Sequence, residues 1–201
     1  MEETSEINAL LNLLEDPDHE VFDTVSTRIV SFGRPIIPNL EQLWEATTDH
    51  VVQEKIELLI HRLHFLELQQ DFIAYANSPA QELLQGALLV ARYQYPDLLS
   101  KPVFDEIDKI KRHIWLELNS YLTALEQVNI MNRIFYTHYK FKGVEVSYQQ
   151  PEEFLINKVL EMKRGNTISS AILYQLFCDL LDIPVKAIKI PKPACLFRYF
   201  V

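Results

Sequence analysis

The chain contains very little glycine. Its 201 residues include four glycines, at positions 33, 86, 143 and 165, and each stands alone, whereas glycine usually makes up about 7% of a protein. Phosphate-cradling loops and dinucleotide fingerprints need clustered glycines, because the backbone must approach the phosphates closely. We therefore expect no nucleotide cofactor, and no other cofactor is predicted.

Cysteine and long apolar runs are equally scarce. The two cysteines, Cys178 and Cys195, are too few for a disulfide-stapled secreted fold, and both stand among apolar neighbours, so we expect reduced, packed thiols. The first six residues are acidic rather than basic, unlike a signal peptide, and no apolar run approaches the ~20 residues that span a bilayer. The sequence predicts a cytoplasmic protein without membrane association.

Positive charge is also in short supply. Acidic residues outnumber basic ones by 28 to 19, for a net charge of −9, which repels phosphate backbones. The basic clusters Lys109–His113 and Lys140–Lys142 are short and mixed with apolar residues. We predict no nucleic-acid binding.

What the chain does have is helical periodicity, together with 48% apolar residues, enough for a sizeable core. Apolar residues at i, i+3, i+4 and i+7 predict a helix over residues 5–15, with Ser5 as its N-cap, and another over residues 19–32. Comparable units open near residues 37 and 80, which indicates an irregular repeat of ~30 to 45 residues. The intervening phrase at 16–21 resembles the inter-helix turn of a HEAT-type repeat, and an ordinary bundle is the alternative.

These units make residues 1–101 a helical-repeat-like region, whose faces offer binding surface for another protein.

Residues 102–201 show a different pattern of predicted elements. The pattern predicts a long helix over 103–139 with a break near Thr123, further helices over 152–162 and 168–181, and strands over 185–190 and 195–201. The predicted class is mostly α, with an α+β C-terminal part.

One motif is distinctive: residues 157–170 read NKVLEMKRGNTISS, followed by Tyr174 and by DIPV at 182–185. This order resembles the transglutaminase-like superfamily, specifically its SirB-type proteins, over residues 115–197. The resemblance implies a papain-like α+β core, here truncated. It also implies that Arg164, Gly165, Asn166 and Thr167 form the turn leading into the core helix. The superfamily's enzymes carry a Cys nucleophile at that helix N-terminus, with a His and an Asp on neighbouring strands.

This chain departs from the enzymes' pattern at both central positions. Ser169 and Ser170 are the candidates where those enzymes have Cys, and the SirB-type pattern likewise has a hydroxyl residue there. Thr167 replaces a proline of the motif, and the Pro-x-His-Phe phrase becomes Pro-Lys-Pro-Ala, so Pro193 and Ala194 occupy the degenerate His position. A hydroxyl without a base is a poor nucleophile. Catalysis by either serine would therefore require His113 or His138 to fold into the site and act as the base.

Structural roles account for the same residues. Ser169 and Ser170 are expected to cap the core helix, and Gly165 is expected in a left-handed turn conformation. Cys178 and Cys195 read as packing residues. His61 and His64, one turn after Glu57, share a helical face, but such histidines are more simply solvated, and no metal site is predicted.

Two main hypotheses follow. The first is a catalytically inactive transglutaminase-like protein that serves as an interaction or scaffold module. The alternative is a hydrolase or acyltransferase of this superfamily that uses a serine nucleophile at the core-helix N-terminus. The observation that distinguishes these two hypotheses is whether an imidazole lies within hydrogen-bond reach of Ser169 or Ser170. Residues 102–201 stop before a strand that would carry a third triad member, so this region is expected to be either naturally short or incomplete.

Overall fold

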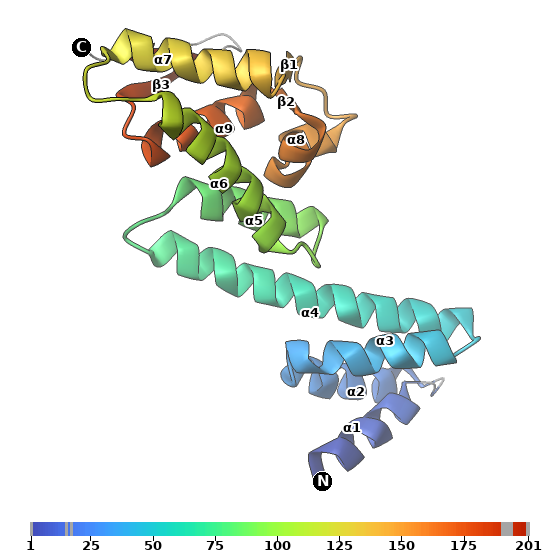
Figure 1. The fold of residues 1–201 in the computed structure, drawn as a ribbon. Helices are drawn as coiled ribbons and strands as arrows, with labels where there is room; N and C mark the ends of the chain where they lie inside the picture. The colour runs from blue at the N-terminus through green and yellow to red at the C-terminus, as the bar shows by residue number, and fades with distance from the viewer. Residues whose placement is uncertain (1, 15, 17, 190–194, 200–201) are drawn as a thin grey trace. The chain divides into compact units, whose positions relative to one another are not determined.

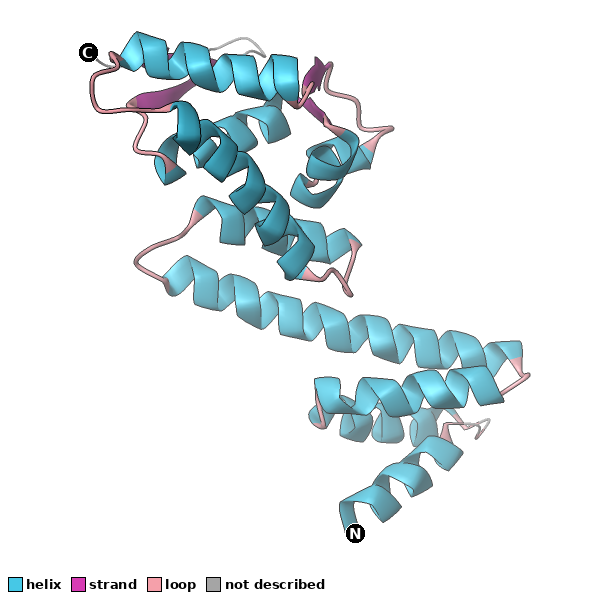
Figure 2. Ribbon diagram, in the orientation of Figure 1, coloured by secondary structure: helices cyan, strands magenta, loops and turns pink. Residues whose placement is uncertain are grey.

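The computed structural model describes residues 2–14, 16, 18–189 and 195–199, and these are mostly helical (Figures 1 and 2). The chain divides into two compact units, Met1–Asn77 and Ser78–Val201. The described strands all belong to the second unit. The predicted class, mostly α with an α+β C-terminal part, is confirmed. None of the described helices combines the length and the apolar character needed to cross a membrane.

The first unit consists of paired helices. Its elements are α1 (Glu2–Leu13), α2 (His19–Ser31), the short 3-10 helix η1 (Arg34–Ile36), α3 (Ile37–Ala46) and the long α4 (His50–Asn77). Its core joins apolar residues from all of these helices, with Leu14, Ile29, Leu40 and Ile56 almost fully buried. The paired helices agree with the pattern found in the sequence, and the repeat character stays a prediction.

Local signals set the helix ends in this unit. The Asp18 side chain accepts a hydrogen bond from the Glu20 N–H at 2.9 Å and thereby caps α2. After α2, Gly33 adopts φ +69°, a left-handed conformation that suits glycine. One expectation is wrong: Ser5 does not cap α1, because the helix already begins at Glu2.

The second unit is built around the apolar helix α9. In chain order these are α5 (Leu83–Gln94), α6 (Ser100–Glu117), α7 (Ala124–Asn132), the π-helix η2 (Arg133–His138), β1 (Lys142–Val144), the 3-10 helix η3 (Pro151–Phe154), α8 (Ile156–Met162), β2 (Arg164–Asn166), α9 (Thr167–Leu180), β3 (Val185–Lys189) and β4 (Cys195–Tyr199). Phe135 and Phe177 are its largest fully buried side chains, and Phe135 stacks on Phe141 with ring centroids 4.2 Å apart.

The break predicted near Thr123 is real. α6 ends at Glu117 and α7 begins at Ala124. Thr123 caps α7 in a capping box, in which its hydroxyl accepts from the Glu126 N–H and the Glu126 carboxylate accepts from the Thr123 N–H. The sequence signal Thr-x-x-Glu accounts for this start.

Strand pairing is divided between two small sheets. β1 and β2 are parallel, with Gly143 opposite Gly165, and β3 pairs antiparallel with β4, with Val185 opposite Tyr199 and Lys189 opposite Cys195. The β3–β4 strands match the two predicted strands. β1 and β2 were not predicted, because three residues are too few to show an alternating pattern.

The two compact units divide between Asn77 and Ser78, and the domain boundary at residues 101 and 102 stays a prediction. α5 contacts α8 and α9, and its Leu84, Leu88 and Ala91 are buried in the second unit's core. The periodicity of α5 resembles that of the preceding helices, so sequence pattern alone grouped it with them. Tertiary packing assigns it to the second unit.

Candidate functional site

The segment that leads into α9 is a strand rather than a turn. α8 ends at Met162, and the next residue, Lys163, takes the left-handed conformation, with φ 54° and ψ 33°. Arg164, Gly165 and Asn166 then form β2, and Thr167 is the first residue of α9. The expected turn over Arg164–Thr167, with Gly165 left-handed, is therefore wrong: the reversal of the chain takes place one residue earlier, at Lys163.

Gly165 is needed for a different reason, namely close approach. A Cβ atom at this position would lie 2.8 Å from Ser169 Oγ, 3.0 Å from Val159 Cγ1 and 3.1 Å from Ser170 Oγ. β2 thus passes directly against the first turn of α9 and against α8. Any side chain here would push these elements apart.

The cap of α9 is Asn166, not a serine. Its Oδ1 accepts hydrogen bonds from the Ile168 N–H at 2.9 Å and the Ser169 N–H at 3.0 Å. Asn166 is fully buried, and its Nδ2 has no hydrogen-bond partner within the part of the chain that the structure describes. The expectation that Ser169 and Ser170 cap the helix is wrong, because both lie inside its first turn.

Ser169 is buried and held in place. It is 1% exposed, and its Oγ donates a hydrogen bond of 2.5 Å to the carbonyl oxygen of Glu153. Asn166 supplies further acceptors at 3.3 Å, its backbone carbonyl and its Oδ1. The hydroxyl proton is therefore committed to a backbone carbonyl, which cannot act as a general base.

Glu153 is the residue at this site that sequence reasoning missed. Its side chain is 5% exposed and forms an ion pair with Arg164 at 2.8 Å, while Arg164 also donates to the side-chain oxygen of Gln150 at 3.2 Å. Glu153 is the second of two adjacent glutamates after Pro151, and such a charged pair gives no signal of burial. The pair fastens η3 to β2 beside the start of α9.

Ser170 is half-buried, and no histidine hydrogen-bonds to either serine among the described residues. His113 and His138 instead contact each other, with ring centroids 4.5 Å apart, and His113 Nδ1 lies 3.4 Å from the Tyr139 hydroxyl. The two histidines considered as bases are thus engaged with one another.

The remaining sequence candidates are placed as follows. Pro193 and Ala194, the degenerate His position, lie outside the described residues. Cys178 is fully buried, with its Sγ 3.8 Å from Met131 Sδ, and desolvation raises the pKa of its thiol to about 12, which disfavours a thiolate. Cys195 lies in β4, paired with Lys189. In unit one, Glu57 accepts from Trp44 Nε1 at 2.9 Å.

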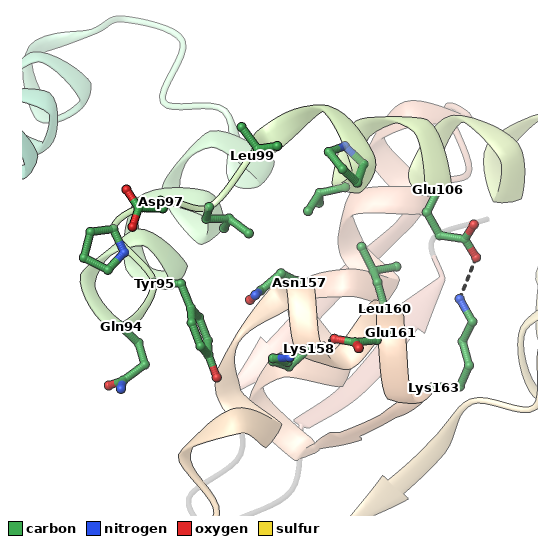
Figure 3. A pocket seen from close by; sticks show the side chains of 14 residues that line it. Gln94, Tyr95, Asp97, Leu99, Glu106, Asn157, Lys158, Leu160, Glu161 and Lys163 are labelled. Atoms are coloured by element: carbon green, nitrogen blue, oxygen red, sulfur yellow. Dashed lines mark hydrogen bonds and ion pairs between the residues drawn. The ribbon is translucent and has the colours of Figure 1, made fainter. Parts of the chain in front are cut away.

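A groove of about 810 Å³ opens elsewhere on the second unit, between the α5–α6 connection and α8. Figure 3 shows Tyr95, Leu99 and Leu160 around it, with Lys163 reaching Glu106 at 2.7 Å. This ion pair helps to keep the pKa of the Glu106 carboxyl low, although desolvation opposes it. Leu99 is 73% exposed. The groove therefore combines open apolar surface with charges that are already paired.

The class of protein follows from comparison with known families. A profile described as the transglutaminase-like superfamily matches residues 101–198. This region, with its core helix α9 behind β2, therefore belongs to that superfamily, as the motif at 157–170 predicts.

Individual relatives are of the SirB type. This chain is 24% identical over 119 residues to a UPF0162 protein of Xylella fastidiosa, an alignment that covers 59% of this chain and 42% of that protein. It is 23% identical over 109 residues to the UPF0162 protein YchA of Escherichia coli K12, covering 54% and 40%. Protein SirB1 of Salmonella typhimurium is 22% identical over 117 residues, covering 58% and 42%.

The chain thus matches about two fifths of the length of these relatives. No solved structure is significantly similar to it. Residues 101–198 are thus transglutaminase-like, and YchA and SirB1 are distant relatives of this chain.

Proposed function

We propose that this chain is a catalytically inactive transglutaminase-like protein that acts as an interaction module for another protein. The observation that carries the proposal is the burial and hydrogen bonding of the Ser169 hydroxyl. A nucleophile must be reached by substrate and must pass its proton to a base. Ser169 is buried and gives its proton to the Glu153 carbonyl oxygen at 2.5 Å.

The supply of bases supports the same proposal. Between residues 78 and 201 the sequence contains two histidines, His113 and His138. They contact each other and Tyr139, and neither hydrogen-bonds to Ser169 or Ser170. A positioned base contributes roughly 10² to 10⁴ in rate, and among the described residues no histidine is placed to give Ser170, which is less buried, that contribution.

The groove beside α8 supports the interaction role. Tyr95, Leu98, Leu99, Pro102 and Leu160 give it an apolar lining, and Lys158 and Glu161 pair at its side at 2.9 Å. Ligand-binding clefts commonly combine apolar walls with a few polar groups that set orientation. We propose that a segment of a partner protein lies here.

Loss of catalysis is tested with an activated serine or cysteine probe on the full chain. We expect no adduct at Ser169, Ser170 or Cys195 when the peptides are resolved by mass spectrometry. Ser170→Ala serves as the control for labelling at the neighbouring residue. An adduct at any of these side chains that also requires the native fold would overturn the inactive reading and favour the hydrolase or acyltransferase.

The interaction role is tested by placing a photo-crosslinking residue at Leu99 or Pro102, which line the groove, in the full chain inside cells. The matched control position is Tyr121, which is 94% exposed and does not line the groove. We expect the same partner at both groove positions and not at the control. Identical adducts at Tyr121, or none in the groove, would contradict the assignment of the groove.

A further inference from the structure

A second hollow in the same unit gathers positive charge, which is scarce in this acidic chain. It has a volume of about 700 Å³ and is lined by Lys109, Arg112, His113, Leu116, His138 and Tyr139. We call it the histidine pocket. Residues 109, 112, 113 and 116 follow i, i+3, i+4 and i+7 spacing, so they share one face of α6. His138 is the last residue of η2, and Tyr139 follows it directly.

The arginine of the pocket has no acidic partner. Arg112 Nε donates to the backbone carbonyl of Asp108 at 3.3 Å, and among the described residues its guanidinium forms no ion pair with a carboxylate. Other arginines of the chain, such as Arg133 and Arg164, each pair with a glutamate. Arg112 therefore keeps most of its five N–H donors available for an anion.

The two histidines that line the pocket contact each other. Their rings are 4.5 Å apart at an interplanar angle of 83°, and His113 Nδ1 lies 3.4 Å from the Tyr139 hydroxyl. Two adjacent imidazoles repel each other when both are protonated. An anion between the pocket walls would remove that repulsion and accept hydrogen bonds from both rings.

The charged groups that face the pocket are mostly cationic. Lys109 and Lys163 place their ammonium groups 5.9 and 5.6 Å from the centroid of the Tyr139 ring. One carboxylate, Glu106, pairs with both of these lysines, at 3.1 Å and 2.7 Å, and Asp105 lies one turn before Lys109 on the same helical face. No acidic side chain lines the pocket itself.

The backbone around His138 is unusual as well. Arg133–His138 is a π-helix, closed by a bond from the Tyr139 N–H to the Ile134 carbonyl at 2.9 Å, and Lys140 follows with φ 58°. Single π-turns within helices occur frequently at functional sites. This turn brings His138 to the face of α6 that carries Arg112 and His113.

From this arrangement we infer that the histidine pocket binds a dianionic phosphate monoester. Arg112 would hold two of the phosphate oxygens, because the guanidinium fork matches that geometry. The Lys109 ammonium and the two imidazoles would supply the remaining donors. The inference does not rest on the proposed interaction role, since the groove beside α8 and the histidine pocket share no lining residue.

The test measures binding of inorganic phosphate and of a phosphoserine peptide to the full chain by NMR, following the imidazole signals of His113 and His138. We expect both signals to move on titration. Arg112→Gln should weaken the binding by roughly tenfold, as the loss of a charge-assisted hydrogen bond predicts. The control is Lys111→Gln, which removes the same charge from the neighbouring position outside the pocket and should leave the affinity within about twofold.

Two results would overturn the inference. In one, Arg112→Gln and Lys111→Gln weaken binding equally, so that overall charge rather than the pocket attracts the anion. In the other, neither phosphate probe moves the imidazole signals while single-stranded RNA binds with a steep salt dependence. If phosphate binds, the tighter of the two probes identifies the source, a free phosphate or a phosphorylated side chain.

The variant with both His113→Gln and His138→Gln tests the part played by the imidazoles. Calorimetry at one fixed pH should show weaker phosphate binding in this variant, because two imidazole donors are lost, while Lys109 and Arg112 still supply residual binding. An unchanged phosphate affinity in that variant would contradict the role of the histidines.

Discussion

The Ser169 hydroxyl donates its proton to the backbone carbonyl oxygen of Glu153 across 2.5 Å, and this bond joins the first turn of α9 to η3. The side chain of Glu153, on the same residue, pairs with Arg164 of β2 at 2.8 Å. One residue of η3 thus fastens both the strand and the helix that follows it. Ser169, which the resemblance predicts to stand at the nucleophile position of the superfamily's enzymes, thus holds η3 against the first turn of α9.

Ser169→Ala should therefore destabilise the protein rather than abolish an activity. The substitution leaves the buried Glu153 carbonyl without this donor, and an unsatisfied buried group costs about 1–3 kcal/mol. The free energy of unfolding from urea denaturation measures the effect. Ser170→Ala is the matched control and should change stability by less than about 0.5 kcal/mol. Equal effects of the two substitutions would argue against a specific stabilising role of the Ser169–Glu153 hydrogen bond.

Gly165→Ala should be destabilising, whereas Gly143→Ala should not. The two glycines face each other in the β1–β2 register, but a Cβ at Gly165 would meet Ser169 Oγ at 2.8 Å, and a Cβ at Gly143 would meet nothing within 4 Å. We expect a loss of about 1–3 kcal/mol for Gly165→Ala and a change within about 0.5 kcal/mol for Gly143→Ala. Chemical denaturation of both variants makes the comparison, and similar losses would show that backbone freedom, not crowding, selects glycine.

Asn166→Ala should weaken the start of α9. Its Oδ1 accepts from two backbone N–H groups, and removal of such a cap costs about 0.5–2 kcal/mol. Asn119→Ala is a suitable control, because the Asn119 Oδ1 also accepts a backbone N–H, from Tyr121, but in an exposed turn. Hydrogen exchange of the Ile168 and Ser169 amides should accelerate in Asn166→Ala alone. Unchanged exchange at these amides would contradict the capping role.

Alkaline pH should destabilise the protein through Cys178. Desolvation raises the pKa of its thiol from 9.0 to about 12. Below pH 9 the thiol is protonated in both states and adds no pH dependence. As the pH rises above 9, the unfolded thiol ionises while the folded one stays protonated, so the free energy of unfolding falls until about pH 12.

Urea denaturation between pH 8 and pH 11 measures this decline, and Cys178→Ala should make it shallower. Burial also raises the pKa of the Tyr174 phenol, so part of the decline should remain in that variant. Identical slopes in the parent chain and the variant would rule out Cys178 as the source.

Capping and periodicity made much of the helical architecture predictable. Asp18 sets the start of α2, and the Thr123–Glu126 capping box sets the start of α7. Both caps join residues at most three positions apart in the sequence. The motif around Gly165 and Asn166 identified the superfamily, which the profile match over residues 101–198 confirms. The conformation within that motif was not predictable, because β2 exists only through its pairing with β1, about twenty residues earlier in the chain.

The sequence by itself determined which segments are helical, which family the C-terminal region resembles and which chemical groups the chain can use, since these depend on neighbouring residues and on composition. Only the tertiary structure decided that Ser169 binds a backbone carbonyl and that His113 meets His138. Both contacts join residues 16 or more positions apart, and only the packing of η3 against α9, and of α6 against η2, brings such residues within hydrogen-bonding or ring-contact distance.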